Sequence, residues 1–318
     1  MSGFSTNQTD HLIRSELWSN RLKEVFLEDL IGMKYVEMIT DFPDGNLINI
    51  PSIGQAEALD YAEEQPIRYT AMDTGNFTFE INEYKHSATY VTNKMKQDSM
   101  YMARVISSFV PKQHRALMKA VELDVLAVGP LNQTTGDNLN TINGGNHRFI
   151  ASGPSETIVL EDFARAQYAL DMANVPVQGR VAIVDPSVAF TLQTQANLVN
   201  LLSPNPQWQN IMNKGMVTGS RFVFSIFGFD VYVSQNLMTL NTTIDGLTTT
   251  SGKANLFFGT AGDACPFIGL VRQPPTVESE YNKDLQRDEH LTIMRYGFDL
   301  YRPESLVVVV SDTDQVYA

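Results

Sequence analysis

The strongest candidate for a catalytic residue is Asp185, which ends the apolar run 181–184 and precedes Pro186. A carboxylate at the end of a buried strand suits an active site, but it needs a base, nucleophile or metal within hydrogen-bond reach. The sequence around it nominates none. An Asp that precedes Pro is typical of a helix N-cap, because the carboxylate accepts N–H groups and Pro fits the first turn. We therefore predict that Asp185 joins a strand to a helix; an α/β enzyme centred on Asp185 is the alternative.

A second group that could do acid–base or metal chemistry is Asp288, Glu289 and His290. Consecutive residues on a strand point to alternate faces, so the three side chains cannot all converge. We predict a solvated turn here. The lone cysteine, Cys265, has no base beside it in the sequence and is predicted to be a buried, inert thiol. No phosphate-binding glycine motif follows a strand, so we expect neither catalysis nor a cofactor.

Four carboxylates gather within residues 57–64: Glu57, Asp60, Glu63 and Glu64. This stretch could bind calcium, but it lacks the dense alternation of oxygen ligands that calcium loops use. An exposed or partner-facing acidic patch is the preferred interpretation.

Short sequence patterns predict several of the helices and strands around these residues. The range 47–92 predicts a long β excursion, with a strand at 47–50 that Pro51 ends and an alternating, half-buried strand from residue 77 onward. A long helix is predicted at 98–128, capped by Asp98 and either kinked or divided at Pro111. Another helix is expected near the N-terminus, within 15–32.

From residue 157 the pattern becomes mixed α/β. An amphipathic helix is predicted with Leu160, Phe163, Tyr168 and Met172 on one face. A strand at 180–184, a hairpin around Gly228 and further strands at 266–273 and 290–301 follow.

Composition limits the class of protein. The chain has 318 residues, 43% of them hydrophobic, enough for a sizeable core. Its net charge of −13 argues against a dedicated nucleic-acid binder. A single cysteine excludes an intrachain disulfide, the longest apolar run is too short to cross a membrane, and the N-terminus does not resemble a signal peptide. A cytosolic protein is expected.

Four stretches, taken in order, resemble one known family: EYKHSATYVTNKMKQDSMYMARVI (83–106), NVPVQGRVAIVDPSVAFTLQT (174–194), IFGFDVYVSQNL (226–237) and EHLTIMRYGFDLYRPESLVVVV (289–310). Each is similar to a segment of the major capsid proteins of tailed bacteriophages of the Hong Kong 97 type. The resemblance covers about residues 15 to 310.

The resemblance implies an α+β chain with the Hong Kong 97-type capsid fold. It implies an N-terminal arm at 1–46, an extended β-hairpin loop at 47–97 and the spine helix of a peripheral domain at 98–129. A mixed α/β axial domain would occupy 130–265. Residues 266–318 would supply peripheral-domain strands and a last axial-domain strand.

The function implied is that of a structural protein, not an enzyme. Hexamers and pentamers would form an icosahedral shell around double-stranded DNA, which the chain contacts non-specifically. A scaffolding protein, a portal and decoration proteins are the other partners implied, with no membrane, and assembly in the host cytoplasm would place the chain in the virion. Because the sequence starts at the arm, the scaffold is expected to be a separate protein. An encapsulin-like compartment shell is the alternative with the same fold.

Physical reach agrees with this interpretation. A compact chain of this length has a radius of gyration of roughly 20 Å, whereas a β arm of about fifteen residues extends about 50 Å. An extended excursion would therefore lie across another copy, and we predict subunit contacts at Glu57, Asp60, Glu63, Glu64 and Arg68. Head-to-tail contacts of this kind close into rings and shells.

Overall fold

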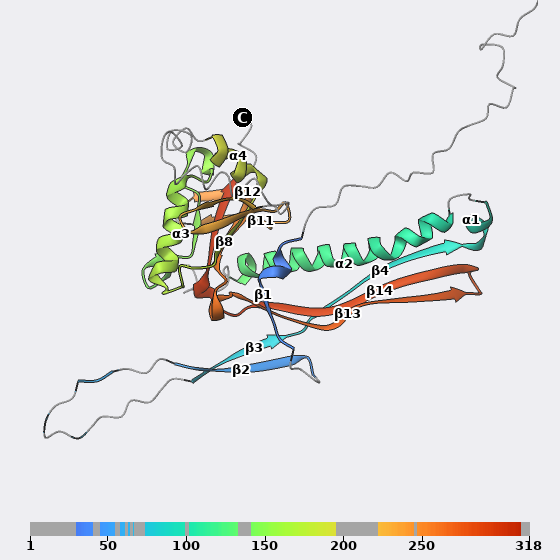
Figure 1. The fold of residues 1–318 in the computed structure, drawn as a ribbon, viewed down its shortest axis with the longest axis horizontal. Coiled ribbons are helices and arrows are strands. Elements are labelled where there is room, and N and C mark those ends of the chain that lie inside the picture. The colour runs from blue at the N-terminus through green and yellow to red at the C-terminus, as the bar shows by residue number, and fades with distance from the viewer. Residues whose placement is uncertain are drawn as a thin grey trace, which may run out of the picture.

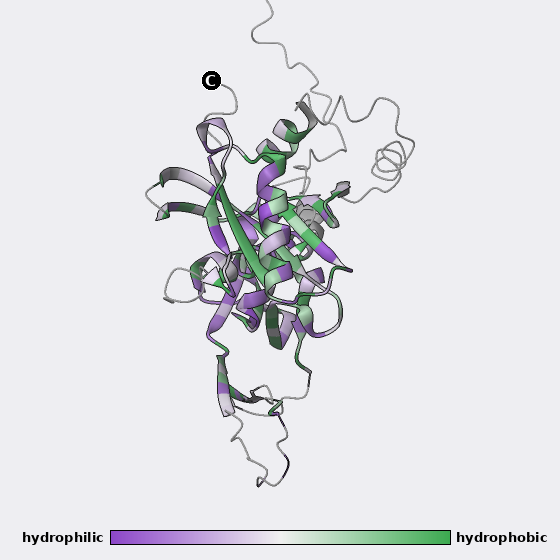
Figure 2. Ribbon diagram, turned by 90° about the vertical axis from the view of Figure 1, so that its left-hand side faces the viewer, coloured by the Kyte–Doolittle hydropathy of each residue, from purple (hydrophilic) through white to green (hydrophobic). Residues whose placement is uncertain are grey.

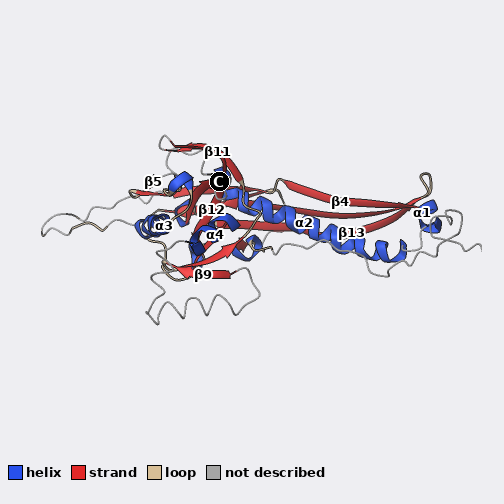
Figure 3. Cartoon of the chain, turned by 90° about the horizontal axis from the view of Figure 1, so that it is seen from above, coloured by secondary structure: helices blue, strands red, loops and turns tan. Residues whose placement is uncertain are grey.

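The computed structural model describes residues 30–40, 45–54, 58–60, 63, 66, 74–98, 102–132, 141–194, 222–244 and 247–312. These residues form a compact body and a long extension in which helix α2 lies along paired strands (Figure 1). The view from above shows how far the extension reaches beyond the body (Figure 3). The helix predicted within 15–32 lies almost wholly outside the described residues.

The body is built on a seven-stranded mixed sheet with the order β7-β15-β12-β8-β10-β9, and β11 pairs with β12. Its strands are β7 (Arg148–Ile150), β8 (Arg180–Val184), β9 (Phe222–Ile226), β10 (Phe229–Val233), β11 (Thr239–Ile244), β12 (Leu247–Gly259) and β15 (Leu306–Asp312). Every residue of β8 and β15 is buried, which explains why their apolar runs are continuous instead of alternating. Hydrophobic residues are concentrated in the centre of this body (Figure 2). The predicted strand at 180–184 is confirmed.

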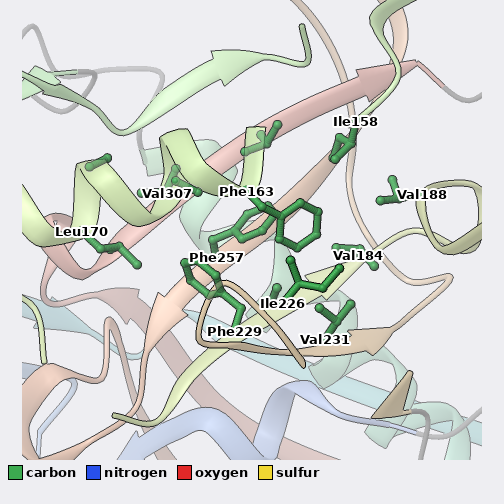
Figure 4. Packing of buried hydrophobic residues seen from close by; sticks show 14 of the residues in the cluster. Ile158, Phe163, Leu170, Val184, Val188, Ile226, Phe229, Val231, Phe257 and Val307 are labelled. Atoms are coloured by element: carbon green, nitrogen blue, oxygen red, sulfur yellow. The ribbon is translucent and has the colours of Figure 1, made fainter. Parts of the chain in front are cut away.

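Helix α3 (Leu160–Met172) covers the main core of the body. The rings of Phe163 and Phe229 both meet Phe257 edge-on, with centroids 5.0 Å and 5.4 Å away (Figure 4). Edge-to-face contacts of this kind stabilise an aromatic core beyond the area they bury.

The face of α3 that we predicted is only partly correct. Phe163 is buried, but Tyr168 and Met172 are 56% and 37% exposed. The other buried positions are Asp162, Ala166, Ala169 and Leu170. A small residue is needed on this face of α3, because the backbone of Gly145 packs closely against it. A Cβ on Gly145 would lie 2.9 Å from the Cα of Ala169.

The connections in the body include one confirmed hairpin. Strands β9 and β10 are joined through Phe227 and Gly228, both with positive φ (48° and 79°), as a two-residue hairpin turn requires. The short elements are β5 (Thr141–Ile142), β6 (Gly145–Asn146) and the 3-10 turns η2 (Gly32–Tyr35), η3 (Pro154–Glu156), η4 (Gly262–Ala264) and η5 (Pro303–Ser305).

The extension is a four-stranded sheet with the order β1-β13-β14-β4. Its strands are β1 (Val36–Met38), β4 (Glu83–Thr92), β13 (Phe267–Asn282) and β14 (Arg287–Leu300), so the strands predicted at 266–273 and 290–301 are both longer than expected. Helix α2 (Met102–Asn132) packs on one face of this sheet, with Leu117 and Val121 against Met294 and Tyr296.

The start of the long helix differs from the prediction. Asp98 is the last residue of a short helix, α1 (Asn93–Asp98), and does not begin the spine helix. The capping signal that we missed is Thr92, whose hydroxyl accepts the N–H of Met95 at 3.4 Å. Pro111 lies inside α2, which continues through it as one helix.

A separate two-stranded hairpin precedes the extension. Strand β2 (Leu47–Ile53) pairs with β3 (Thr74–Glu80), and β2 runs past Pro51 instead of ending there. In β3 the predicted alternation is confirmed, since Phe79 is buried between exposed neighbours. Strand β4, which we had placed in the same extended loop, pairs with β14 along the extension. The hydrogen-bonded part of the projecting hairpin therefore ends at Glu80.

This hairpin and α2 lie on opposite faces of the four-stranded sheet. Ile268 and Leu270 of β13 pack in one cluster with Phe79. Val271, which points to the other face, packs with Leu117 of α2. The root of the hairpin is thus fixed to the face that α2 leaves open.

Candidate subunit-contact surfaces

Asp185 caps the helix that follows it. Its Oδ2 accepts the backbone N–H of Ser187 at 3.0 Å and the Ser187 hydroxyl at 2.6 Å, at the start of α4 (Pro186–Thr194). The backbone N–H of Asp185 is held by the side chain of Asn255 at 2.9 Å. The predicted capping role is confirmed.

Asn255 is a structural residue that the sequence did not reveal. It is fully buried in β12, and its amide nitrogen donates to the carbonyl oxygen of Val309 at 3.1 Å and to the hydroxyl of Ser311 at 2.8 Å. Together with its bond to Asp185, this ties β8, β12 and β15 to one another. Its polar groups satisfy backbone atoms, as buried polar groups normally must.

We predicted a solvated turn at 288–290, and this prediction is wrong, because these residues are part of β14. Their three side chains do not converge. Asp288 forms an ion pair with Lys96, while Glu289 accepts a bond from Arg287 at 2.6 Å. The bond from Arg287 lowers the pKa of Glu289. Neighbouring side chains use different partners because they alternate across the strand.

Cys265 is partly buried, and its thiol donates to the carbonyl oxygen of Tyr35 at 3.0 Å. Burial raises the pKa of the thiol, so it stays protonated and is a poor nucleophile. Within the described ranges, no group of three or more His, Cys, Asp or Glu side chains is placed to hold a metal ion. Of the helices described, none is both long and apolar enough to cross a membrane.

A buried carboxylate on α2 fixes the N-terminal segment. Glu122 is fully buried, and its two oxygens accept the backbone N–H groups of Ile31 at 2.9 Å and Gly32 at 2.6 Å. Burial raises the pKa of Glu122, while these N–H groups and the charge of Arg115 oppose the rise. The residues that follow Gly32 continue into β1, which pairs with β13.

The predicted contact residues lie beyond the paired part of the β2–β3 hairpin. Asp60 and Glu63 are exposed, as is the nearby Leu59, at 47%. Glu57, Glu64 and Arg68 lie outside the described residues. An exposed leucine beside carboxylates, as at Leu59 and Asp60, is typical of a surface that contacts another protein.

The sheet face opposite α2 also carries exposed apolar side chains. Tyr84 and Tyr90 on β4 are 59% and 60% exposed, and their registered partners on β14 are Arg295 and Glu289. Between them on β14 lie the partly exposed Leu291 and Ile293. This open face is a second surface on which a neighbouring chain could pack.

The resemblance found in the sequence is supported by comparison with known proteins. The chain has the fold of phage capsid structures, among them a chain of Mycobacterium phage Che8 (18% identity, TM-score 0.68, covering 94% of this chain and 97% of that chain) and the capsid of Cyanophage P-SCSP1u (15%, 0.71, 98% and 96%). The capsid asymmetric unit of Cyanophage Pam1 is similar to the same degree (14%, 0.69, 98% and 99%). This is the Hong Kong 97-type capsid fold.

The sequence itself shows the family. Residues 78–309 match the phage capsid protein family, and no curated protein sequence matches the chain. The chain belongs to the phage capsid protein family, which confirms the resemblance to a major capsid protein of tailed bacteriophages.

Proposed function

We propose that hexamers and pentamers of this chain assemble into an icosahedral shell that encloses double-stranded DNA. Membership of a capsid family supports a structural role without catalysis or a cofactor. The remaining partners follow from the resemblance: a scaffolding protein, a portal and decoration proteins, with assembly in the host cytoplasm before the chain becomes part of the virion. Family membership also favours a capsid over an encapsulin-like compartment.

The observation that carries this proposal is the β2–β3 hairpin. Its root is fixed to the long sheet through Phe79, Ile268 and Leu270. Ile53 and Thr74 form the last pair of the hairpin, and the sequence places residues 54–73 beyond that pair. Asp60 and Glu63 are exposed within this part. A projecting element of this length makes its contacts on another copy, and each such contact is repeated many times in a closed shell.

The regions predicted from the sequence form part of this proposal. Residues 1–46 would be the N-terminal arm and 47–97 the extended loop. Residues 98–129 would be the spine helix, 130–265 the axial domain, and 266–318 the remaining peripheral strands with the last axial strand. The contacts assigned to the extended loop are Glu57, Asp60, Glu63, Glu64 and Arg68.

Expression of the chain, alone and together with its scaffolding protein, tests the proposal. Electron microscopy of the purified product should show closed particles with icosahedral symmetry. A monodisperse monomer that persists across salt, pH and concentration would contradict it.

A further inference from the structure

Strand β4 forms an unprotected edge of the long sheet. It is the last strand in the order β1-β13-β14-β4, and among the described strands it pairs only with β14. The view from above shows it along one edge of the extension (Figure 3). Its ten residues run without a register shift, a Pro or a Gly. Proteins usually protect an edge with such interruptions or with a short strand, because an unpaired edge accepts strands of other chains. The free side of β4 is therefore available to a further strand.

Alternate residues of β4 direct their backbone groups to this free side. Asn93, which follows β4, donates its N–H to the carbonyl oxygen of Gln286 at 3.0 Å and so continues the register of β4 with β14. Since bonded and non-bonded pairs alternate along two antiparallel strands, the odd-numbered residues of β4 bond to β14. The even-numbered residues within 84–92 direct their N–H and C=O groups away from it. A further strand can bond to these groups.

The side chains of the same even-numbered residues lie on the open face of the sheet. Tyr84, His86, Ala88 and Tyr90 are all exposed. The odd-numbered Lys85 points the other way and binds Asp124 of α2, so the one lysine of the strand does not protect this face. An exposed tyrosine toward each end of the strand suits aromatic pairing with a neighbouring strand.

The sequence of β4 is complementary to itself in one antiparallel register. When Ser87 of one copy lies opposite Ser87 of a second copy, Tyr84 of each copy lies opposite Tyr90 of the other. His86 then lies opposite Ala88. Cross-strand aromatic pairs stabilise a sheet. A shift of the register by two residues in either direction breaks both tyrosine pairs, so one register is favoured.

The charges of two copies are compatible in this register. Glu83 and Lys85 each lie opposite an uncharged residue, so no like charges face each other. Antiparallel pairing also brings the end of one β4 beside the beginning of the other. The exposed Lys94, which follows β4, thus comes near the exposed Glu80, which precedes it. A second copy therefore meets opposite charge at both ends of the strand.

The fold leaves room for this pairing. A two-fold axis perpendicular to the sheet places both copies of α2 on the same face. Each α2 packs on β14, against Met294 and Tyr296, and three strand spacings of about 4.8 Å separate the two copies of β14. The helices would then lie roughly 14 Å apart, whereas helices in contact lie about 8–10 Å apart. The two helices therefore do not collide.

We propose that two copies of the chain pair antiparallel through the free edges of β4, with Ser87 of each copy at the shared two-fold axis, so that their two long sheets become one. The interface is isologous, because the same strand serves both copies. The edge would also accept a strand of another protein, but the self-complementary register favours a second copy. This inference rests on the proposed function, because it names one contact between copies in the shell.

The first test is a disulfide across the axis. Opposed residues of a non-bonded pair have Cα atoms about 4.5 Å apart, which suits a disulfide. Ser87→Cys should therefore give a disulfide-linked dimer on a non-reducing gel after mild oxidation of the particles. Thr89→Cys is the matched control from the same strand and face, since its two copies lie roughly 14 Å apart along the strand, too far for a disulfide. The wild-type chain controls for the native Cys265.

Charge substitutions at the tyrosines test the register. Tyr84→Lys/Tyr90→Lys and Tyr84→Glu/Tyr90→Glu each place like charges opposite one another. Each variant alone should raise the concentration needed for assembly several-fold. An equimolar mixture places opposite charges together and should assemble close to the wild-type concentration. Recovery on mixing excludes misfolding of either variant as the cause.

The expected result is a dimer from Ser87→Cys, but from neither control, together with recovery on mixing. Absence of that dimer, or equal crosslinking of Thr89→Cys, overturns the inference. Wild-type assembly of both like-charge variants also overturns it, as does a mixture that assembles no better than either variant alone. Failure of the wild-type chain to form particles would instead overturn the proposed function. Crosslinking of Ser87→Cys in solution then still tests the pairing of β4.

Discussion

The carboxylate of Glu122 accepts the backbone N–H of Gly32 at 2.6 Å, across 90 residues of chain. A Cβ on residue 32 would lie 2.8 Å from Oε2 of Glu122, so the approach depends on the glycine. The bond fixes the point at which the N-terminal segment meets the spine helix. A charged group buried at such a point stabilises the fold only while its hydrogen bonds are kept.

Replacing Glu122 should destabilise the chain in a pH-dependent way. Glu122→Ala leaves two buried N–H groups without their acceptor and should cost about 1–3 kcal/mol for each. Glu122→Gln keeps one acceptor oxygen and should cost less. Denaturant unfolding, followed by circular dichroism, gives both free energies.

The pH dependence has a definite sign. The pKa of Glu122 is raised in the folded chain above its ordinary value of 4.5, so the folded chain binds the proton at a higher pH than the unfolded chain does. Wild-type stability should therefore rise, relative to Glu122→Gln, as the pH falls through the raised pKa, with the gain complete below 4.5. A stability difference that stays constant from neutral pH down to that value would contradict this account.

Gly32→Ala should weaken the same contact from the other side. The new methyl group would also lie 3.3 Å from Cγ1 of Val125, and we expect a loss of roughly 1–3 kcal/mol. Because the two residues touch, the double variant Gly32→Ala/Glu122→Gln should lose less than the sum of the single losses. Strict additivity in the unfolding free energies would show that the two residues act independently.

Asp185→Ala should cost about 0.5–2 kcal/mol through the lost cap of α4, and Asp185→Asn less, because Asn also caps helices. Ser187→Ala is the matched control, since it removes only the 2.6 Å bond to the hydroxyl. All three variants should still assemble. An enzymatic turnover that disappears in Asp185→Asn while assembly persists would establish the rival, catalytic role.

Neutralising the carboxylates between β2 and β3 should weaken assembly without lowering the free energy of unfolding. The variant Glu57→Gln/Asp60→Asn/Glu63→Gln/Glu64→Gln removes charges that individually contribute about 0.2–1 kcal/mol per exposed contact. Because each contact recurs throughout the shell, the concentration needed for assembly, measured by light scattering, should rise several-fold. Added salt should raise it for the wild-type chain but little for the variant. Equal assembly of both chains at every salt concentration would remove these residues from the interface.

Local signals made part of this structure predictable. The junction from β8 to α4 follows from an apolar run and an Asp-Pro pair, and the capping residue Asp185 lies two residues before Ser187, whose N–H it accepts. The two-residue turn at Gly228 and the alternation around Phe79 are likewise written in neighbouring positions. Such features need no knowledge of the rest of the chain.

Contacts between distant segments were not predictable. Glu122 and Asn255 look like ordinary polar residues in apolar stretches, and their partners lie 90 and 70 residues away. The sheet residues 288–290 suggested a turn because the outer part of β14 is polar and only partly buried, and the outer part of β13 that pairs with it is largely exposed. Pairing of two long strands, not burial, determines their structure.

The central claim is that the residues between β2 and β3 contact an adjacent copy in the shell. Shortening this stretch of chain tests the claim most directly. Ile53 and Thr74 are directly paired, so replacing residues 54–73 with Asn-Gly, a two-residue hairpin turn, leaves both strands able to pair. The shortened chain should fold, with unchanged circular dichroism and unfolding free energy close to wild type, but electron microscopy should show no closed particles. Closed particles of normal size from the shortened chain would contradict the account.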